Sequence, residues 1–152
     1  MVEETAPGAG VLTHIENRGA KMVELRCAPL PYIGAIAEHY WLVVRDEASG
    51  ACNRWEVWQT ADAGGRSFGH VHCDLKPPDA GVGGGPMRVV ARWEGREADS
   101  LGSVLQGTER HYPHAHRYRP WPGPNSNTFV AWVLRQAGIG FRLPWKAIGK
   151  DY

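Results

Sequence analysis

Residues 121–138, WPGPNSNTFVAWVLRQAG, carry the strongest helix signal in this 152-residue chain. A Pro-Gly-Pro approach leads into the small polar residues 125–128, and an apolar run of helical period then ends at Gly138. Asparagine and serine are preferred at helix N-caps, and glycine is preferred at the C-terminal end of helices. We therefore predict a helix over residues 125–138, with Asn125 as its N-cap and Gly138 as its C-cap.

The apolar residues of this helix repeat at helical spacing, which places them on one side. Trp132 widens that face. The face itself consists of Phe129, Val130, Val133, Leu134 and Ala137. We expect this side of the helix to be buried in the core.

Short β-type segments precede the helix and are separated by glycine and proline. Strands are predicted at 21–30, 67–75 and 87–95, and a hairpin is predicted at 37–60 with its turn at Ser49 and Gly50. A weaker helix is predicted at 96–111, and residues 112–124, with four prolines, should be irregular. The predicted class is α+β, with a loosely ordered N-terminal arm at 1–20 and a single domain at 21–152.

Composition and charge narrow the class of protein. The chain is 43% hydrophobic and 22% charged, as in ordinary globular proteins, and its formal net charge is only +1. No general field therefore attracts nucleic acid, and the longest apolar runs, YWLVV and VAWVL, are too short to span a membrane. We expect neither a nucleic-acid partner nor a membrane span, while the oligomeric state stays open.

Cysteine content and the first residues bear on localisation. Cys27, Cys52 and Cys73 are odd in number and widely spaced, so no disulfide framework follows. The opening residues MVEETAPGAG lack the basic and apolar regions of a signal peptide. We expect a cytoplasmic protein.

Ser126 stands at the start of the predicted helix, where it could cap the helix or act as a nucleophile. Asn125 already suffices as a cap, so Ser126, Asn127 and Thr128 exceed what capping requires. Unpaired N–H groups at a helix start can hold an oxyanion, but a serine nucleophile also needs a general base. Seven histidines could supply that base.

NSNTFVAWV resembles the Asn-Cys-x-x-Phe helix start of the circularly permuted papain-like proteins, which include NlpC-related, lecithin retinol acyltransferase-like and PPPDE-type groups. The early segment AEHYWLVVR is similar to the histidine-bearing strand of those proteins, and RWEVWQT follows as its hairpin partner. The resemblance implies a permuted papain-like (NlpC-like) antiparallel sheet packed on the C-terminal helix. Serine stands here in the position of the nucleophilic cysteine.

Carried over residue by residue, this resemblance implies a site for amide or ester hydrolysis or acyl transfer. Ser126 takes the nucleophile position, His39 the base position, and Glu56, or alternatively Gln59, the orienting position. The backbone N–H groups of Ser126 and Asn127 would hold the oxyanion. Further oxyanion or substrate-binding residues are expected to be Asn125, Asn127, Gln59, Tyr112 and Arg117. The substrate would be a small molecule, a lipid or a peptide, and no cofactor is implied.

The segment 22–152 also resembles an uncharacterised bacterial family, a domain of unknown function with a Gly-Pro-Asn-Ser-Asn-Thr-Phe core. Because fold resemblance alone does not establish activity, a second hypothesis is a non-catalytic, degenerate module that binds a ligand or peptide in the same cleft.

A third hypothesis is a metal site at the histidine-rich segments. HVHC (70–73) and HYPHAH (111–116) together offer nitrogen and sulfur ligands, but their spacing matches no standard zinc pattern. The candidate ligands are His70, His72, His111, His114 and His116. We favour the interpretation that these are surface or loop histidines, and we assign no metal ligand.

Overall fold

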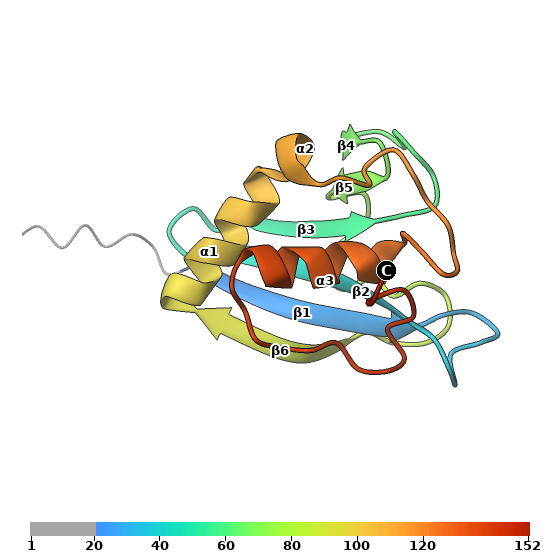
Figure 1. The fold of residues 1–152 in the computed structure, drawn as a ribbon. Helices are drawn as coiled ribbons and strands as arrows, with labels where there is room; N and C mark the ends of the chain where they lie inside the picture. The colour runs from blue at the N-terminus through green and yellow to red at the C-terminus, as the bar shows by residue number, and fades with distance from the viewer. Residues whose placement is uncertain (1–20) are drawn as a thin grey trace, which may run out of the picture.

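The computed structural model describes residues 21–152, so the predicted N-terminal arm at 1–20 lies outside the described residues. A six-stranded antiparallel sheet forms one layer, with the strand order β4-β5-β3-β2-β1-β6 (Figure 1). The strands are β1 (Lys21–Pro29), β2 (Glu38–Asp46), β3 (Cys52–Val57), β4 (Arg66–Phe68), β5 (Val71–Cys73) and β6 (Arg88–Glu94).

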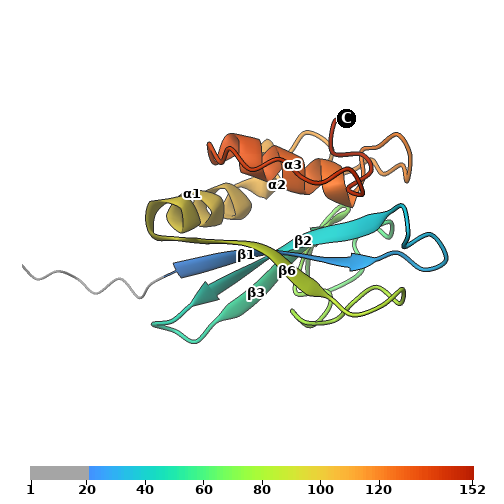
Figure 2. The ribbon, with the colours of Figure 1, turned by 90° about the horizontal axis from the view of Figure 1, so that it is seen from below.

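Three helices form the second layer and lie on one face of the sheet (Figure 2). They are α1 (Gly95–Gln106), α2 (Thr108–His111) and α3 (Ser126–Gln136). The α+β class is therefore confirmed. Within the described part of the chain, every helix is too short or too polar to cross a membrane.

The central strands agree with the sequence predictions. The predicted strand at 21–30 is β1, and the predicted hairpin at 37–60 is the β2–β3 pair, in which Leu42 lies opposite Trp55. The predicted strand at 87–95 is β6, which pairs with the other side of β1. The alternation of side chains and the turn residues were enough to predict these strands, because each segment is a complete strand with polar or glycine-rich ends.

Two predicted elements are divided in the structure. The single strand predicted at 67–75 is the short hairpin β4–β5, because Gly69 turns the chain with a φ of +57°. A side chain at Gly69 would also collide with the carbonyl oxygen of Ala115. The helix predicted at 96–111 ends at Gln106 and resumes at Thr108, with Gly107 between α1 and α2. Glycine is unfavourable in the interior of a helix, which accounts for the break between α1 and α2 at Gly107.

Both ends of α3 are capped. The Asn125 side chain accepts hydrogen bonds from the N–H groups of Asn127 (2.9 Å) and Thr128 (3.3 Å), and the Thr128 hydroxyl accepts one from the Asn125 N–H (3.0 Å). At the other end the C-cap is Ala137, and Gly138 follows it with a φ of +72°. Gly138 was predicted as the C-cap but lies one residue beyond it, where a left-handed residue closes the helix.

The apolar face of α3 packs against the sheet, as the helical spacing predicted. Phe129, Val130 and Val133 are fully buried, Leu134 and Trp132 are nearly so, and Ala137 is half-buried. A smaller apolar cluster lies apart from this core and includes Ala28, Trp41, Val43 and Val82. Trp41 and Val43 alternate with Tyr40 and Leu42 along β2, so the two clusters occupy opposite faces of the sheet.

Replacing Phe129 with alanine should lower the free energy of unfolding by about 3–5 kcal/mol, because the change opens a cavity in the core between α3 and the sheet. Urea denaturation measures this loss. The control Gln136→Ala changes an exposed side chain of the same helix and should alter stability by less than about 0.5 kcal/mol. Equal, small losses in both variants would contradict the packing described above.

Candidate active site

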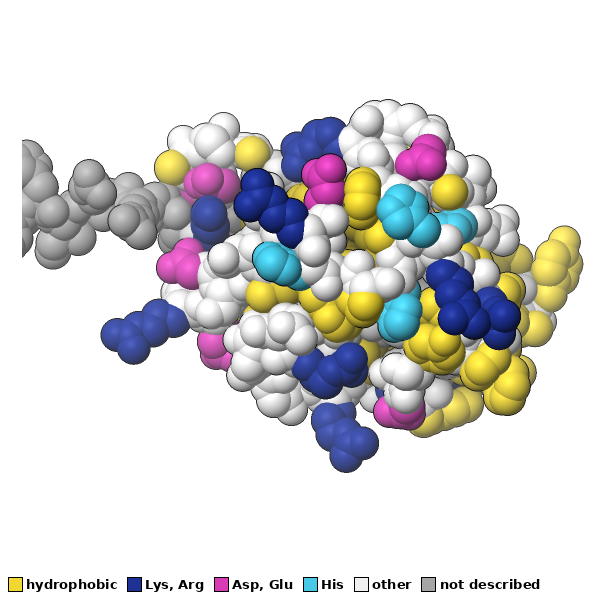
Figure 3. All heavy atoms as spheres, turned by 45° about the horizontal axis from the view of Figure 1, so that its top comes forward, with side chains coloured by type: hydrophobic (Ala, Val, Ile, Leu, Met, Phe, Trp, Pro, Cys, Tyr) yellow, Lys and Arg dark blue, Asp and Glu magenta, His cyan; other side chains and the backbone are white. Residues whose placement is uncertain are grey.

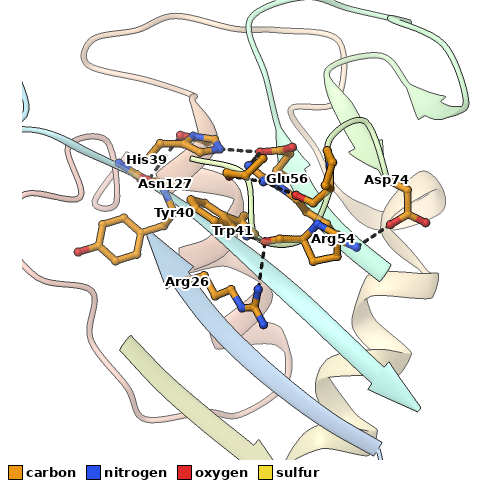
Figure 4. Close-up of polar contacts among 12 residues, drawn as sticks. Arg26, His39, Tyr40, Trp41, Arg54, Glu56, Asp74 and Asn127 are labelled. Atoms are coloured by element: carbon orange, nitrogen blue, oxygen red, sulfur yellow. Dashed lines mark hydrogen bonds and ion pairs between the residues drawn. The ribbon is translucent and has the colours of Figure 1, made fainter. Parts of the chain in front are cut away.

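Asn127 connects the start of α3 to the open edge of β2. β3 pairs with β2 only at residues 42–45, so the β2 backbone at Glu38 and Tyr40 lacks a strand neighbour on that side. The Asn127 side chain fills this gap: its Oδ1 accepts from the Tyr40 N–H at 3.1 Å, and its Nδ2 donates to the Glu38 carbonyl at 2.9 Å (Figure 4). The same Nδ2 also donates to the carbonyl of Ile148 at 3.0 Å. Asn127 therefore fixes the helix start beside His39.

His39 is buried between two tryptophans. Its ring stacks on Trp41, with centroids 5.6 Å apart, and meets the edge of Trp58 at 5.0 Å. Its Nε2 is 2.7 Å from Oε2 of Glu56 on the neighbouring strand (Figure 4). Strand pairing explains this contact. One step beyond the pair of Leu42 and Trp55, the β2–β3 register places Trp41 opposite Glu56. His39 is two residues from Trp41 and therefore lies on the same face of β2.

Arg54 holds the Glu56 carboxylate in place. Its Nη2 donates to the same Glu56 Oε2 at 2.8 Å, and its Nη1 donates to the carbonyls of Pro77 (2.9 Å) and Ala80 (2.6 Å). The guanidinium lies 4.0 Å from the centre of the Trp41 ring. Both Arg54 and Glu56 are completely buried, so the ion pair is shielded from water.

Burial and charge set the protonation states of the pair. Burial lowers the pKa of His39 below its usual value, although the hydrogen bond and charge of Glu56 oppose that change. Burial alone would raise the pKa of Glu56, but its contacts with His39 and Arg54 outweigh burial and hold the pKa below the usual value. The pair is therefore a neutral imidazole beside a carboxylate at neutral pH.

This state determines which ring nitrogen can act as a base. A carboxylate only accepts hydrogen bonds, so Nε2 of the neutral His39 ring must carry the proton. Nδ1 is then unprotonated. Among residues 21–152 Nδ1 has no hydrogen-bond partner, and His39 is one of the residues that line a pocket.

Ser126 lines the same pocket as His39. It is the first residue of α3 and is 7% exposed. Its hydroxyl donates a long hydrogen bond of 3.4 Å to Oδ1 of Asn127. Over the described residues, no hydrogen bond joins Ser126 to His39. The two groups thus share a pocket without being in direct contact.

The pocket has a volume of about 440 Å³ and is mostly apolar. Its polar lining comes from the start of α3, from β2 and from Gln59, which follows β3. Such a mostly apolar cavity with a few convergent polar groups is the usual form of a small-molecule site.

The other expected site residues are distributed differently. Asn125 lines the pocket, but its side chain is engaged in capping α3. The N–H of Asn127, expected to hold an oxyanion, instead donates to Asn125, so it is not available for that role. Tyr112 is buried in the core against Phe129 and Trp132, and neither Tyr112 nor the exposed Arg117 lines the pocket.

Two residues that hold the site did not emerge from the sequence. The sequence pattern predicts only that Arg54 and Trp41 lie in strands, whereas the structure shows that Arg54 contacts Glu56 and that Trp41 stacks on His39. An available signal was the alternation along the hairpin, which places Arg54 and Glu56 on the same face as His39 and Trp41. A buried arginine beside a glutamate indicates a paired charge.

The histidine-rich segments do not converge on a metal site. His72 uses both ring nitrogens, at 2.7 Å from the Ser67 hydroxyl and at 2.8 Å from the Thr60 carbonyl. His70 contacts the Trp58 carbonyl at 2.9 Å. Residues 21–152 contain no group of three or more histidine, cysteine or acidic side chains placed to hold a metal ion.

A family model covers residues 20–152 and is described as "protein of unknown function (DUF3750)". The chain belongs to this family, which carries no assigned activity. No curated protein and no solved structure matches the chain.

Stability should fall as the pH drops below about 6.5, because the unfolded chain then binds protons that buried His39 and His72 resist in the folded state. Each such histidine contributes a slope of at most about 1.4 kcal/mol per pH unit in the window from 6.5 down to its folded pKa. Urea unfolding between about pH 5 and about pH 7.5 measures this slope.

His39→Gln should reduce the slope of the free energy of unfolding against pH, and His72→Gln should reduce that slope by a further, independent amount. The double variant should therefore be the least dependent on pH. A slope that His39→Gln leaves unchanged would mean that His39 takes up a proton as easily in the folded state as in the unfolded chain.

Proposed function

We propose that this family member is a serine-dependent amide or ester hydrolase, or an acyltransferase, of the permuted papain-like type. Ser126 is the nucleophile, His39 the general base, and Glu56 the residue that orients His39. The observation that carries this proposal is the buried hydrogen bond between His39 Nε2 and Glu56, which leaves Nδ1 free to act as a base in a histidine that lines the same pocket as Ser126.

The proposed reaction follows from these protonation states. Ser126 Oγ attacks the substrate carbonyl while its proton passes to His39 Nδ1. The resulting imidazolium is stabilised by the Glu56 carboxylate at 2.7 Å. His39 then returns the proton to the leaving amine or alcohol, and the acyl group stays on Ser126. Water gives hydrolysis of this acyl-enzyme, whereas another alcohol or amine gives acyl transfer.

The start of α3 supplies part of the oxyanion site. With the Asn127 N–H engaged by Asn125, the remaining backbone donor beside the nucleophile is the N–H of Ser126. The exposed Gln59 side chain lines the same pocket and can donate from its amide. The positive end of the α3 dipole adds to the stabilisation of negative charge there.

The order of elements supports the permuted papain-like type. The strand with His39 comes early, and the helix with Ser126 comes late and packs on the antiparallel sheet. The pocket forms where the helix start meets β2.

A second function that fits the same pocket is a non-catalytic module that binds a small ligand or peptide there. The Ser126 hydroxyl bonds to Asn127, and within residues 21–152 it does not bond to His39. Catalytic hydrogen bonds are often long before substrate binds, so this geometry is compatible with both functions.

Labelling with a fluorophosphonate tests the catalytic proposal. The wild-type protein should be labelled, and both Ser126→Ala and His39→Ala should abolish the labelling. Ser103→Ala is the matched control, because Ser103 is an exposed serine on α1 and should leave the labelling unchanged. Labelling that persists in Ser126→Ala would place the reactive group elsewhere.

Ser126→Cys tests the pairing with His39 without requiring a fitting substrate. The helix start and His39 should lower the thiol pKa below its free value of about 8.5, so iodoacetamide should react at about pH 6 faster than with an ordinary thiol. His39→Ala should slow this reaction. A thiol that reacts like free cysteine whether or not His39 is present would favour the non-catalytic module.

The native cysteines define the background for this measurement. Burial raises the pKa of Cys27 to about 11 and that of Cys73 to about 12, so neither thiol should react at about pH 6. Cys52 is half-buried and is replaced by alanine first. The Cys52→Ala protein without the Ser126→Cys change is the control and should not react.

A further inference from the structure

Large exposed hydrophobic side chains lie on the segments that line the pocket and the surface hollow beside it. Residues 21–152 contain seven such side chains, and six of them lie on the segments 30–37, 120–122 and 145–152. We name these six the apolar rim: Tyr32, Ile33, Ile36, Trp121, Trp145 and Tyr152. The seventh, Val89, lies on the edge strand β6. Patches of this kind on a protein surface mark interaction sites.

The rim is continuous with the pocket. Ile33 and Trp121 line the pocket that contains His39 and Ser126. Trp121 also lines a neighbouring surface hollow of about 330 Å³, together with Trp145 and Tyr152. An apolar chain could therefore pass from the rim into the pocket along apolar side chains.

Basic side chains lie near the rim and the pocket. Arg119 is exposed beside Pro120, which lines the pocket. Lys146 Nζ lies 5.5 Å from the Trp145 ring, and Lys76 Nζ lies 4.1 Å from the Trp58 ring. Among the described residues, none of these three cations forms a salt bridge, whereas the nearby Asp151 is paired with Lys150. Hydrophobic and basic side chains stand side by side at the right of Figure 3.

We propose that the apolar rim docks on an anionic lipid surface and that the pocket receives an acyl chain from it. The substrate class of the Ser126 site is then a lipid ester or amide, a specification that rests on the proposed function. Tryptophan and tyrosine favour the boundary between lipid and water, because their rings are apolar and carry one polar group. Lysine and arginine beside them attract anionic headgroups.

Charge complementarity selects a lipid surface over a second copy of this chain. Arg119 and Lys146 lie beside the rim and form no salt bridge with any of residues 21–152, so two copies facing each other through the rim would bring like charges together. An acyl chain that moves from a lipid layer through the rim also reaches the pocket without crossing water, which avoids the cost of exposing its apolar surface.

Co-sedimentation with vesicles tests the docking. The probes are vesicles of phosphatidylglycerol and, for comparison, vesicles of phosphatidylcholine. The wild-type protein should bind phosphatidylglycerol vesicles more strongly, and the double variant Trp121→Ala/Trp145→Ala should lose that binding. Val89→Ala is the matched control, because it removes an exposed hydrophobic side chain outside the rim and should bind like the wild type.

The double variant Arg119→Ala/Lys146→Ala tests the contribution of charge. Each cation near an anionic surface favours binding by about fivefold, so binding to phosphatidylglycerol should fall by about 25-fold. Binding to phosphatidylcholine should change little. Each variant should keep the circular dichroism spectrum of the wild type, because the substituted side chains of Trp121, Trp145 and Arg119 are exposed.

The outcomes separate the docking from the catalysis. Ser126→Ala should bind vesicles like the wild type, so vesicle binding without fluorophosphonate labelling would support docking and contradict catalysis. Labelling without vesicle binding would support catalysis and overturn docking. A wild-type dimer that becomes monomeric in Trp121→Ala/Trp145→Ala would also overturn the proposal, because the rim would then bind a second copy.

Discussion

The carboxamide of Asn127 is the contact on which the arrangement of the site depends. Where β3 leaves the edge of β2, the Tyr40 N–H and the Glu38 carbonyl would be buried without a partner, which costs free energy. One carboxamide supplies the acceptor and the donor that these groups need. An aspartate carboxylate could accept from Tyr40 but could not donate to Glu38. The start of α3 is thereby fixed to the strand that carries His39.

A second constraint acts from the far side of His39. Glu56 is buried as an anion, which requires a compensating cation and further hydrogen bonds. Arg54 supplies the charge, and the carbonyls of Pro77 and Ala80 hold Arg54. His39 donates from Nε2 to Oε2, the same carboxylate oxygen that Arg54 contacts. One sheet face therefore fixes the ring tautomer of His39, while the helix on the other face fixes Ser126.

The sequence predicted those features that depend on local pattern. The helix at 125–138 followed from a cap residue and an apolar period, and the hairpin at 37–60 followed from two β-type runs around Gly50. The division of residues 67–75 into two strands could not be predicted in this way. It depends on Gly69 lying against the backbone of Ala115, a contact between segments far apart in sequence.

The candidate site could be predicted from the sequence only in part, because some of its contacts join segments that are far apart in the chain. His39, Glu56 and Ser126 were selected from motif order, and the structure places His39 and Ser126 at one pocket, with Glu56 hydrogen-bonded to His39. The role of Asn127 depends on which strand edge is left unpaired, and the role of Arg54 depends on the carbonyls of residues 77 and 80. Neither follows from spacing along the chain.

The ¹⁵N NMR spectrum of the histidine rings at about pH 7 tests the central claim most directly, with His39→Gln used to assign the signal. The account predicts a neutral His39 ring with its proton on Nε2 and an unprotonated Nδ1. A ring with its proton on Nδ1, or one protonated on both nitrogens at that pH, would contradict it. In either state His39 could not accept the proton of Ser126 through Nδ1.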